Sequence, residues 1–142
     1  MVRIESVTEA TPEVHAALAR LLPQLNAQLA IPTMKRLQAI MADPAVTLLV
    51  ARDGQEIVGT TTLIVYTTPF WIKARLDEVV VDESARGKGI ATALVKASLE
   101  IAREKGVEVV ELQSGVKREA ANRLYPSLGF KLRETNVYRI VL

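Results

Sequence analysis

Cysteine is absent from the 142 residues of this chain, and histidine occurs once, as His15. The first absence excludes disulfide bonds, thiolate nucleophiles and cysteine-ligated zinc, and the single histidine excludes a metal site built from several histidines. A Ser-His-Asp triad would have to use His15, and no Gly-x-Ser-x-Gly elbow supports one. We therefore expect no metal ion and a reaction without a covalent enzyme intermediate.

Long apolar runs are also missing: no segment is long enough to cross a bilayer, and none has the pattern of a signal peptide. The net charge is only +2, which gives no reason to expect a nucleic acid as partner. We therefore expect a cytoplasmic protein with no membrane or nucleic-acid partner. A length of 142 residues suits one domain, covering residues 1–142, with a substantial core.

Apolar periodicity and turn residues divide the chain into strands and helices. The predicted strands cover residues 2–8, 46–51, 56–66, 74–81 and 107–112, with one or two closing strands within 130–142. The predicted helices cover residues 12–22, 34–42, 89–105 and 119–128, and residues 24–33 form either a broken helix or a mobile lid. Strand 74–81, helix 89–105 and strand 107–112 form a βαβ unit, whose strands should be parallel. Gly59, inside a strand, indicates a bulge or a close approach.

A glycine-rich loop follows the strand that ends in Val79, Val80 and Val81, a β-branched run typical of a strand covered on both faces. Gly87 and Gly89 let the backbone curl, so that successive N–H groups can point at one spot. The helix that follows adds its free N–H groups and the positive end of its dipole. Because Arg86 and Lys88 add positive charge, the loop predicts a site for a di- or polyphosphate.

Other interpretations of this loop fit less well. The Walker pattern is mimicked by Gly54 to Thr60, but no Lys follows Gly59. The Rossmann fingerprint has Thr92 where its third Gly should be, although Glu111 lies roughly 20 residues on, where a ribose-binding acid would sit. A single βαβ unit argues against that dinucleotide fold. An ordinary strand-to-helix turn that happens to carry Gly and Lys is the remaining alternative.

Arg86, Gly89 and Ala91 match the acyl-CoA signature of the Gcn5-related N-acetyltransferase (GNAT) family, which reads Arg or Gln, two residues, Gly, one residue, and Gly or Ala. Downstream, Tyr125 stands four residues before a Gly-Phe pair, as it often does in that family. The chain resembles the family clearly from about Ile57 to its end. The resemblance implies an α/β, single-domain fold. Its mostly antiparallel sheet would be flanked by helices and include a parallel βαβ unit that splays at the acyl-CoA site.

The resemblance also implies acetyl-CoA as co-substrate. The residues then expected to bind it are Val79, Val80, Val81, Arg86, Gly87, Lys88, Gly89, Ile90, Ala91, Thr92 and Asn122. The valine strand would pair with the extended pantetheine arm and offer an N–H to the thioester oxygen. Many relatives carry an Asn seven residues before the Tyr, a position held here by Arg118. Asn122 would compensate for that Asn, or Arg118 would reach a CoA phosphate.

Three residues are candidates for proton transfer. Tyr125 matches the family's Tyr, and a phenol with a pKa of about 10 can reprotonate a CoA thiolate. Glu78 is the first candidate for the base that deprotonates the amine, and Asp77 the second, with their side chains on opposite faces of the strand. This acidic pair resembles that of the sugar-phosphate acetylating branch. The alternatives are a core role for Tyr125, a strand-edge or salt-bridge role for the acidic pair, and a water chain as base.

The expected function is transfer of an acetyl group from acetyl-CoA to a primary amine by direct attack in a ternary complex. The alternatives are a non-catalytic CoA-binding regulatory module and a Rossmann-like nucleotide binder. The acceptor would be an amine of a small molecule, a peptide or a protein, held by residues 24–33 and 67–73. Phe70 and Trp71 in the second segment would line its pocket, cover the sheet or form a homodimer contact.

Overall fold

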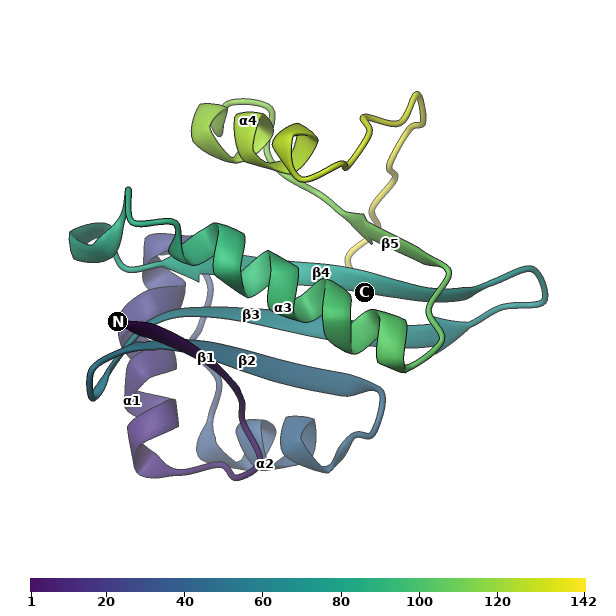
Figure 1. Ribbon diagram of the computed structural model, residues 1–142. Helices are drawn as coiled ribbons and strands as arrows, with labels where there is room; N and C mark the ends of the chain where they lie inside the picture. The colour runs from purple at the N-terminus through teal and green to yellow at the C-terminus, as the bar shows by residue number, and fades with distance from the viewer.

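The structure, a computed structural model that describes all residues from Met1 to Leu142, is built on one five-stranded sheet in the order β1-β2-β3-β4-β5 (Figure 1). The strands are β1 (Val2–Ser6), β2 (Val46–Asp53), β3 (Glu56–Thr67), β4 (Ile72–Val81) and β5 (Val109–Leu112). Neighbouring strands are antiparallel except β4 and β5, which are parallel. The predicted mixed sheet with one βαβ unit is therefore confirmed.

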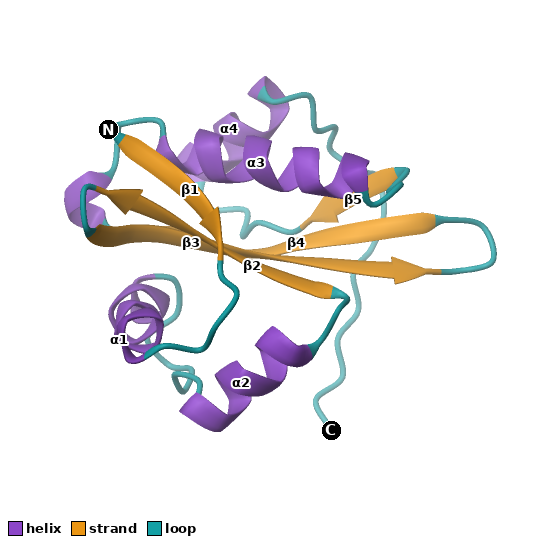
Figure 2. Ribbon diagram, turned by 60° about the horizontal axis from the view of Figure 1, so that its bottom comes forward, coloured by secondary structure: helices purple, strands orange, loops and turns teal.

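Helices cover both faces of the sheet, with α1 and α2 on one face and α3 and α4 on the other (Figure 2). Their bounds are α1 (Pro12–Leu21), α2 (Met34–Ala42), α3 (Ile90–Glu104) and α4 (Glu119–Ser127), with 3-10 turns η1 (Leu22–Gln24) and η2 (Glu83–Ala85). Thr11 and Thr33 cap the first two helices, because their side chains accept hydrogen bonds from the first turn. None of these helices combines the length and apolarity that crossing a membrane requires.

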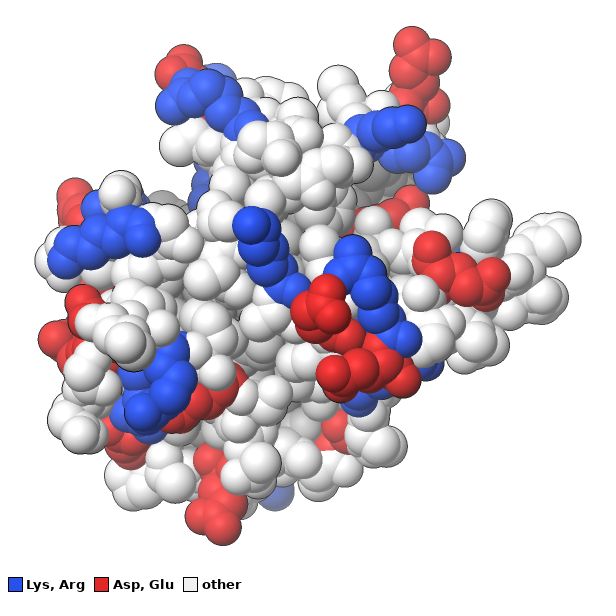
Figure 3. Space-filling model, viewed as in Figure 1, with Lys and Arg blue, Asp and Glu red and all other residues white.

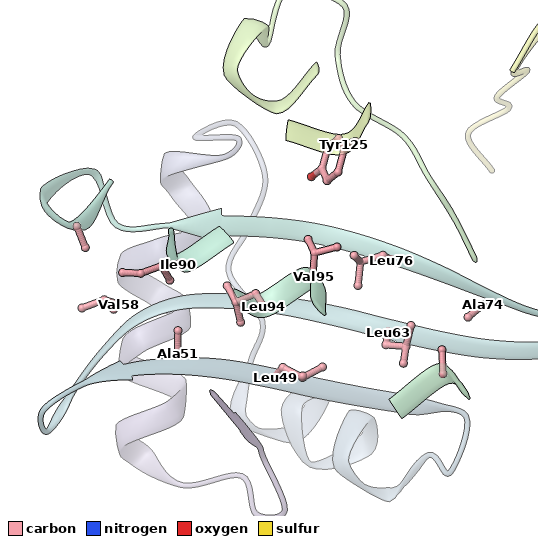
Figure 4. Close-up of a cluster of buried hydrophobic side chains, with 12 residues drawn as sticks. Leu49, Ala51, Val58, Leu63, Ala74, Leu76, Ile90, Leu94, Val95 and Tyr125 are labelled. Atoms are coloured by element: carbon pink, nitrogen blue, oxygen red, sulfur yellow. The ribbon is translucent and has the colours of Figure 1, made fainter. Parts of the chain in front are cut away.

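The core consists of two apolar clusters, one on each face of the sheet. On the α3 side, Leu94 and Val95 pack against Leu49, Leu63 and Leu76 of the strands (Figure 4). On the other side α1 and α2 bury their apolar faces; the fully buried leucines there are Leu21 and Leu37. Each such side chain contributes roughly 1.5–3 kcal/mol, so the two clusters hold the sheet rigid between its helical layers.

A bulge interrupts β4. Thr60 pairs with Val80 and Thr62 with Asp77, so Glu78 and Val79 together oppose one residue of β3. Side chains four residues apart normally point to the same face of a sheet, but the bulge changes this. Leu76 belongs to the cluster on the α3 side, whereas Val80 belongs to the cluster on the α1 side. The expectation that Asp77 and Glu78 lie on opposite faces assumed unbroken alternation, which this bulge removes.

Gly59 of β3 marks both a bulge and a close approach. The pairing of β2 with β3 shifts between Ala51 and Arg52, directly opposite. A Cβ atom at Gly59 would lie 3.1 Å from Leu94 Cδ1 and 3.2 Å from the Val80 carbonyl oxygen. The missing side chain therefore lets the first turns of α3 pack tightly on the sheet, beside the end of β4.

The prediction of closing strands within residues 130–142 is wrong. This segment contains no strand, and every residue from Lys131 to Leu142 is exposed. Its β-branched and aromatic residues favour a strand, but a strand also needs backbone partners. The segment contacts β5 through the Arg133–Glu111 ion pair and forms no backbone hydrogen bond with it.

Residues 25–33 form neither a helix nor a strand. They are tied to α1 at their far end, where His15 Nε2 lies 2.8 Å from the Pro32 carbonyl oxygen. The carbonyl can only accept, so Nε2 is the donor. The only histidine thus has a structural role in positioning this segment.

Candidate active site

Two neighbouring strands of the sheet, β4 and β5, differ in length, so the end of β4 has no partner on the β5 side. The two strands pair only from Lys73↔Val109 to Leu76↔Leu112, whereas β4 continues to Val81. A cleft of about 460 Å³ lies beside this unpaired end. The predicted site residues that line it are Val79, Val80, Val81, Arg86, Gly87, Gly89, Ile90, Ala91, Thr92 and Tyr125.

The loop before α3 presents free hydrogen-bond donors to this cleft. Gly87 and Gly89 have φ angles of +80° and +75°, and a Cβ atom on either would meet nothing within 4 Å. Glycine is therefore required by the backbone conformation and not by crowding. None of the backbone N–H groups from Arg86 to Thr92 donates a hydrogen bond within the protein, and α3 has no side-chain cap. Such a row of amides at the positive end of a helix dipole suits an anion.

Lys and Arg side chains lie on the loop side of the molecule, with acidic side chains among them (Figure 3). Arg86 lines the cleft, and its Nε donates to the Val81 carbonyl oxygen at 3.2 Å. Arg118, just before α4, lines the cleft as well. Lys88 is exposed and lies outside the lining, so it contributes only at longer range.

The end of β4 offers an open backbone edge. The N–H of Asp82 donates to Val58 of β3 at 2.8 Å. Successive residues of an antiparallel strand point their backbone groups to opposite edges, so the N–H and C=O of Val81 point away from β3, toward the cleft. An extended, amide-bearing ligand can pair with such an edge.

Tyr125 lies above this open edge, on α4. It is only 7% exposed, and its ring packs edge-on against Phe130, with ring centres 5.8 Å apart. Figure 4 shows its hydroxyl pointing toward the end of the sheet where α3 begins. Burial raises the pKa of this phenol above its ordinary 10.0, an effect that Arg118 partly opposes. Tyr125 therefore holds its proton at neutral pH and can donate it.

Glu78 occupies the bulge next to Val79, and it is not among the residues that line the cleft. Its φ of +54° makes it the only residue other than glycine with a positive φ, a conformation that costs on the order of 1–2 kcal/mol. Its side chain is exposed, yet partial desolvation by the surrounding protein is the main cause that raises its pKa above 4.5. The charge of Asp77 raises the pKa further, and Arg36 of α2 opposes both. A strained carboxyl with a raised pKa is a candidate base, because such groups cluster at functional sites.

Asp77 and Asn122 lie outside the cleft. Asp77 pairs with Arg75 at 2.9 Å, which is the salt-bridge alternative expected for the acidic pair. Asn122 Nδ2 donates to the carbonyl oxygens of Gly115 and Arg118, both at 2.8 Å. Its amide therefore holds the turn before α4, and Arg118 takes the place at the cleft.

The turn that carries Phe70 and Trp71 lies at the other end of β4 from Val81. The ten residues of β4 separate it from the cleft by roughly 30 Å. Phe70 is 89% exposed, so it neither lines the cleft nor covers the sheet. The expectation that this turn forms a wall of an acceptor pocket is therefore wrong, because the length of β4 separates the two.

Sequence reasoning placed residues 24–33 at the acceptor, but it did not single out Gln24 or its contact with the turn before the glycine loop. Gln24 and Leu25 line the cleft, and Gln24 Oε1 accepts a hydrogen bond of 2.9 Å from Glu83 N–H. Arg20 pairs with Asp82 nearby, at 3.6 Å. The end of α1 thus holds the turn that leads into the glycine loop. No local pattern marks Gln24. Ala121, however, stands three residues before Leu124 and four before Tyr125, a spacing that puts them along one face of α4 and could have indicated that second wall.

A mixed sheet with two parallel strands that separate beside a glycine-rich loop is the arrangement expected of the acyl-CoA-dependent transferases that the sequence resembles. The model of the acetyltransferase (GNAT) family matches residues 14–130, and the chain belongs to that family. It is 41% identical over 61 residues to an uncharacterized N-acetyltransferase of Methanocaldococcus jannaschii, covering 43% of this chain and 27% of that protein. It is 38% identical over 84 residues to human N-acetyltransferase 8B, covering 58% of this chain and 37% of that protein.

The chain thus spans well under half of the length of either curated relative. Among solved structures, an aminoglycoside acetyltransferase from an uncultured soil metagenomic sample superposes with a TM-score of 0.87. The match covers 99% of this chain and 95% of that one, at 24% sequence identity. At this identity the likeness concerns the fold, and it agrees with the mixed sheet and flanking helices described above.

Proposed function

We propose that this chain is an N-acetyltransferase that binds acetyl-CoA in the cleft and transfers its acetyl group to a primary amine by direct attack in a ternary complex. The observation that carries the proposal is the row of free N–H groups from Arg86 to Thr92, set beside the unpaired end of β4. An anion site and an open strand edge, side by side, suit a ligand that joins a pyrophosphate to an amide-bearing arm.

Different residues bind different parts of acetyl-CoA. The loop Arg86–Thr92 holds the pyrophosphate through its backbone amides, and Arg86 and Arg118 add positive charge. The outward-pointing N–H of Val81 pairs with a pantetheine carbonyl, and Val79 lines the cleft beside it. Bound acetyl-CoA supplies a thioester as the acetyl donor. Leu25 and Tyr125 both line the cleft beside this strand edge.

Two side chains move protons. Glu78 accepts a proton from the incoming ammonium group, directly or through water, because an alkylamine is mostly protonated at neutral pH. Tyr125 donates a proton to the departing thiolate, and its raised pKa keeps that proton available. Asp77 tunes Glu78 through its negative charge and does not touch the substrate.

The acceptor is a primary amine of a small molecule, a peptide or a protein. Residues 25–33 flank the cleft through Leu25 and expose Leu29 and Ile31. This segment therefore contributes the contacts that select the acceptor. A cationic group is suited to the acceptor site, because the Glu78 carboxyl lies next to the cleft-lining residue Val79.

The proposal is tested by incubating the chain with acetyl-CoA and a panel of primary amines while free thiol is measured. Calorimetric titration with acetyl-CoA runs in parallel. We expect acetyl-CoA binding, and thiol release matched mole for mole by acetylated amine with at least one acceptor class. Tertiary amines of the same charge serve as control, because they cannot form a stable amide. Binding without release from any amine would instead support the regulatory module, and binding of NAD but not acetyl-CoA would support a nucleotide binder.

A further inference from the structure

Arg118, the N-cap residue of α4, lines the cleft together with Tyr125 of the same helix. The two stand seven residues apart, which is about two helical turns, so they share one face of α4. Helical side chains lean toward the N-terminus of their helix, so the phenol of Tyr125 leans toward Arg118. A proton donor and a permanent cation therefore face the same space.

The turn before α4 holds Arg118 in place. Its N–H donates to the Gly115 carbonyl oxygen at 3.0 Å, and its own carbonyl accepts from Asn122 Nδ2 at 2.8 Å. The stem of its side chain lies over Gly115, since a Cβ atom there would be 3.8 Å from Arg118 Cγ. The guanidinium forms no ion pair, although Glu119 is the next residue. A positioned cation without a carboxylate partner is available to a ligand in the cleft.

The charge of Arg118 acts on the Tyr125 hydroxyl. The charged residues that line the cleft are Arg86, Arg118 and Glu119. Among them only Arg118 shifts the pKa of Tyr125, which it lowers against the raising effect of burial, and no charged residue of β4, β5 or α3 contributes. Positive charge therefore lies near the phenol that would meet a departing thiolate.

Proton transfer from Tyr125 to the thiolate is unfavourable without further help. The phenol has a pKa above 10.0, whereas a thiol has a pKa of about 8.5, so complete transfer is disfavoured by about 30-fold or more. Throughout this step one negative charge remains, on the sulfur before transfer and on the phenol oxygen after it. A cation close to both atoms stabilises that charge in either position.

We propose that Arg118 is a further catalytic residue, whose guanidinium stabilises the negative charge that the departing CoA sulfur shares with Tyr125. This inference rests on the acetyl transfer proposed above. As the tetrahedral intermediate collapses, the C–S bond breaks and its electron pair stays on the sulfur. Tyr125 gives its proton to the sulfur, and a proton from solvent then restores the phenol. The guanidinium keeps all its protons and acts through its charge alone.

The first test compares the affinities for CoA and for desulfo-CoA, which has hydrogen in place of the thiol, by calorimetric titration at neutral and at alkaline pH. In the parent chain CoA should gain about fivefold over desulfo-CoA as pH rises, because Arg118 lowers the pKa of the bound thiol. In Arg118→Gln this ratio should not rise. Lys117→Gln is the matched control: it removes the same charge from an exposed neighbour outside the cleft lining, so it should behave as the parent chain does.

The ligand pair separates a role at the sulfur from a role at the phosphates. A ratio that rises in Arg118→Gln as it does in the parent chain would overturn the inference. A variant that loses affinity for both ligands equally at every pH would overturn it too, because Arg118 would then hold a phosphate. A parent chain that binds neither ligand would instead overturn the proposed function, and the inference with it.

The second test measures thiol release from acetyl-CoA in a single turnover. Arg118→Gln should lower this rate about 10- to 100-fold. It should leave the Kd of acetyl-CoA within about twofold, because the sulfur carries no charge until the C–S bond breaks. Arg118→Lys keeps the charge and should regain most of the rate. In Arg118→Gln the decline at high pH should move to higher pH, because the charge that lowers the pKa of Tyr125 is gone. A raised Kd with an unchanged rate would contradict the inference.

Discussion

The Tyr125→Phe variant is expected to bind acetyl-CoA within about twofold of the parent chain and to lose about 10²- to 10³-fold in kcat. The ring stays buried against Phe130, so the cleft keeps its shape and its anion loop. Only the proton that leaves with the thiolate is lost. The measurement is the rate of thiol release in a single turnover, with enzyme in excess, because this isolates the chemical step from product release.

The pH profile makes this result specific to proton donation. In the parent chain the rate should fall at high pH, as Tyr125 loses its proton at a pKa above 10.0, and the variant should lack this decline. Tyr138→Phe removes an exposed hydroxyl elsewhere and should change nothing. A Tyr125→Phe variant with full activity across the pH range would show that another group, or water, donates the proton.

The Glu78→Gln variant is expected to lose about 10²-fold or more in kcat/KM at neutral pH. In the parent chain kcat/KM should rise with pH as the Glu78 carboxyl ionises, at a pKa above 4.5. This acid limb should be absent from the variant. The matched control is Asp77→Asn: it removes the negative charge that helps to raise the pKa, so the acid limb should shift to lower pH without disappearing.

A stability measurement shows whether Glu78→Gln loses activity through catalysis or through unfolding. Folded Glu78 keeps its proton to a higher pH than the unfolded chain does, so the folded state binds more protons between 4.5 and the raised pKa. Its carboxyl therefore lowers the free energy of unfolding as pH rises through that window, and the penalty is fully present above the raised pKa. Glu78→Gln should leave stability at pH 7 unchanged or higher, as measured by urea unfolding. An inactive variant that is also less stable would point to a structural role.

The features that sequence predicted are local ones. The glycine loop, its cations and the helix after it occupy consecutive residues, and their backbone requirements can be read from residue types alone. The strand and helix order followed from periodicity in the same way. The roles of Tyr125 and of the valine strand came from the family resemblance, and the structure brings both to one cleft with the loop.

The features that sequence did not predict depend on distant partners. The bulge at Glu78 exists only in the register between β3 and β4, and no single-strand pattern encodes that register. Gln24 reaches the site because α1 packs beside η2, far away in the sequence. Residues 130–142 have strand-forming side chains but no ladder within their own chain. Phe70 and Trp71 were misplaced because the length of β4 sets their distance from the cleft.

The central claim is that the backbone amides from Arg86 to Thr92 bind the pyrophosphate of a CoA ligand. The most direct test is a titration of the ¹⁵N-labelled chain with CoA, followed through its backbone amide resonances. The account predicts that these amides, with that of Val81, shift more than the others and saturate together at one ligand per chain. Saturable binding that leaves the resonances of Gly87 to Thr92 unmoved, or no binding at all, would contradict it.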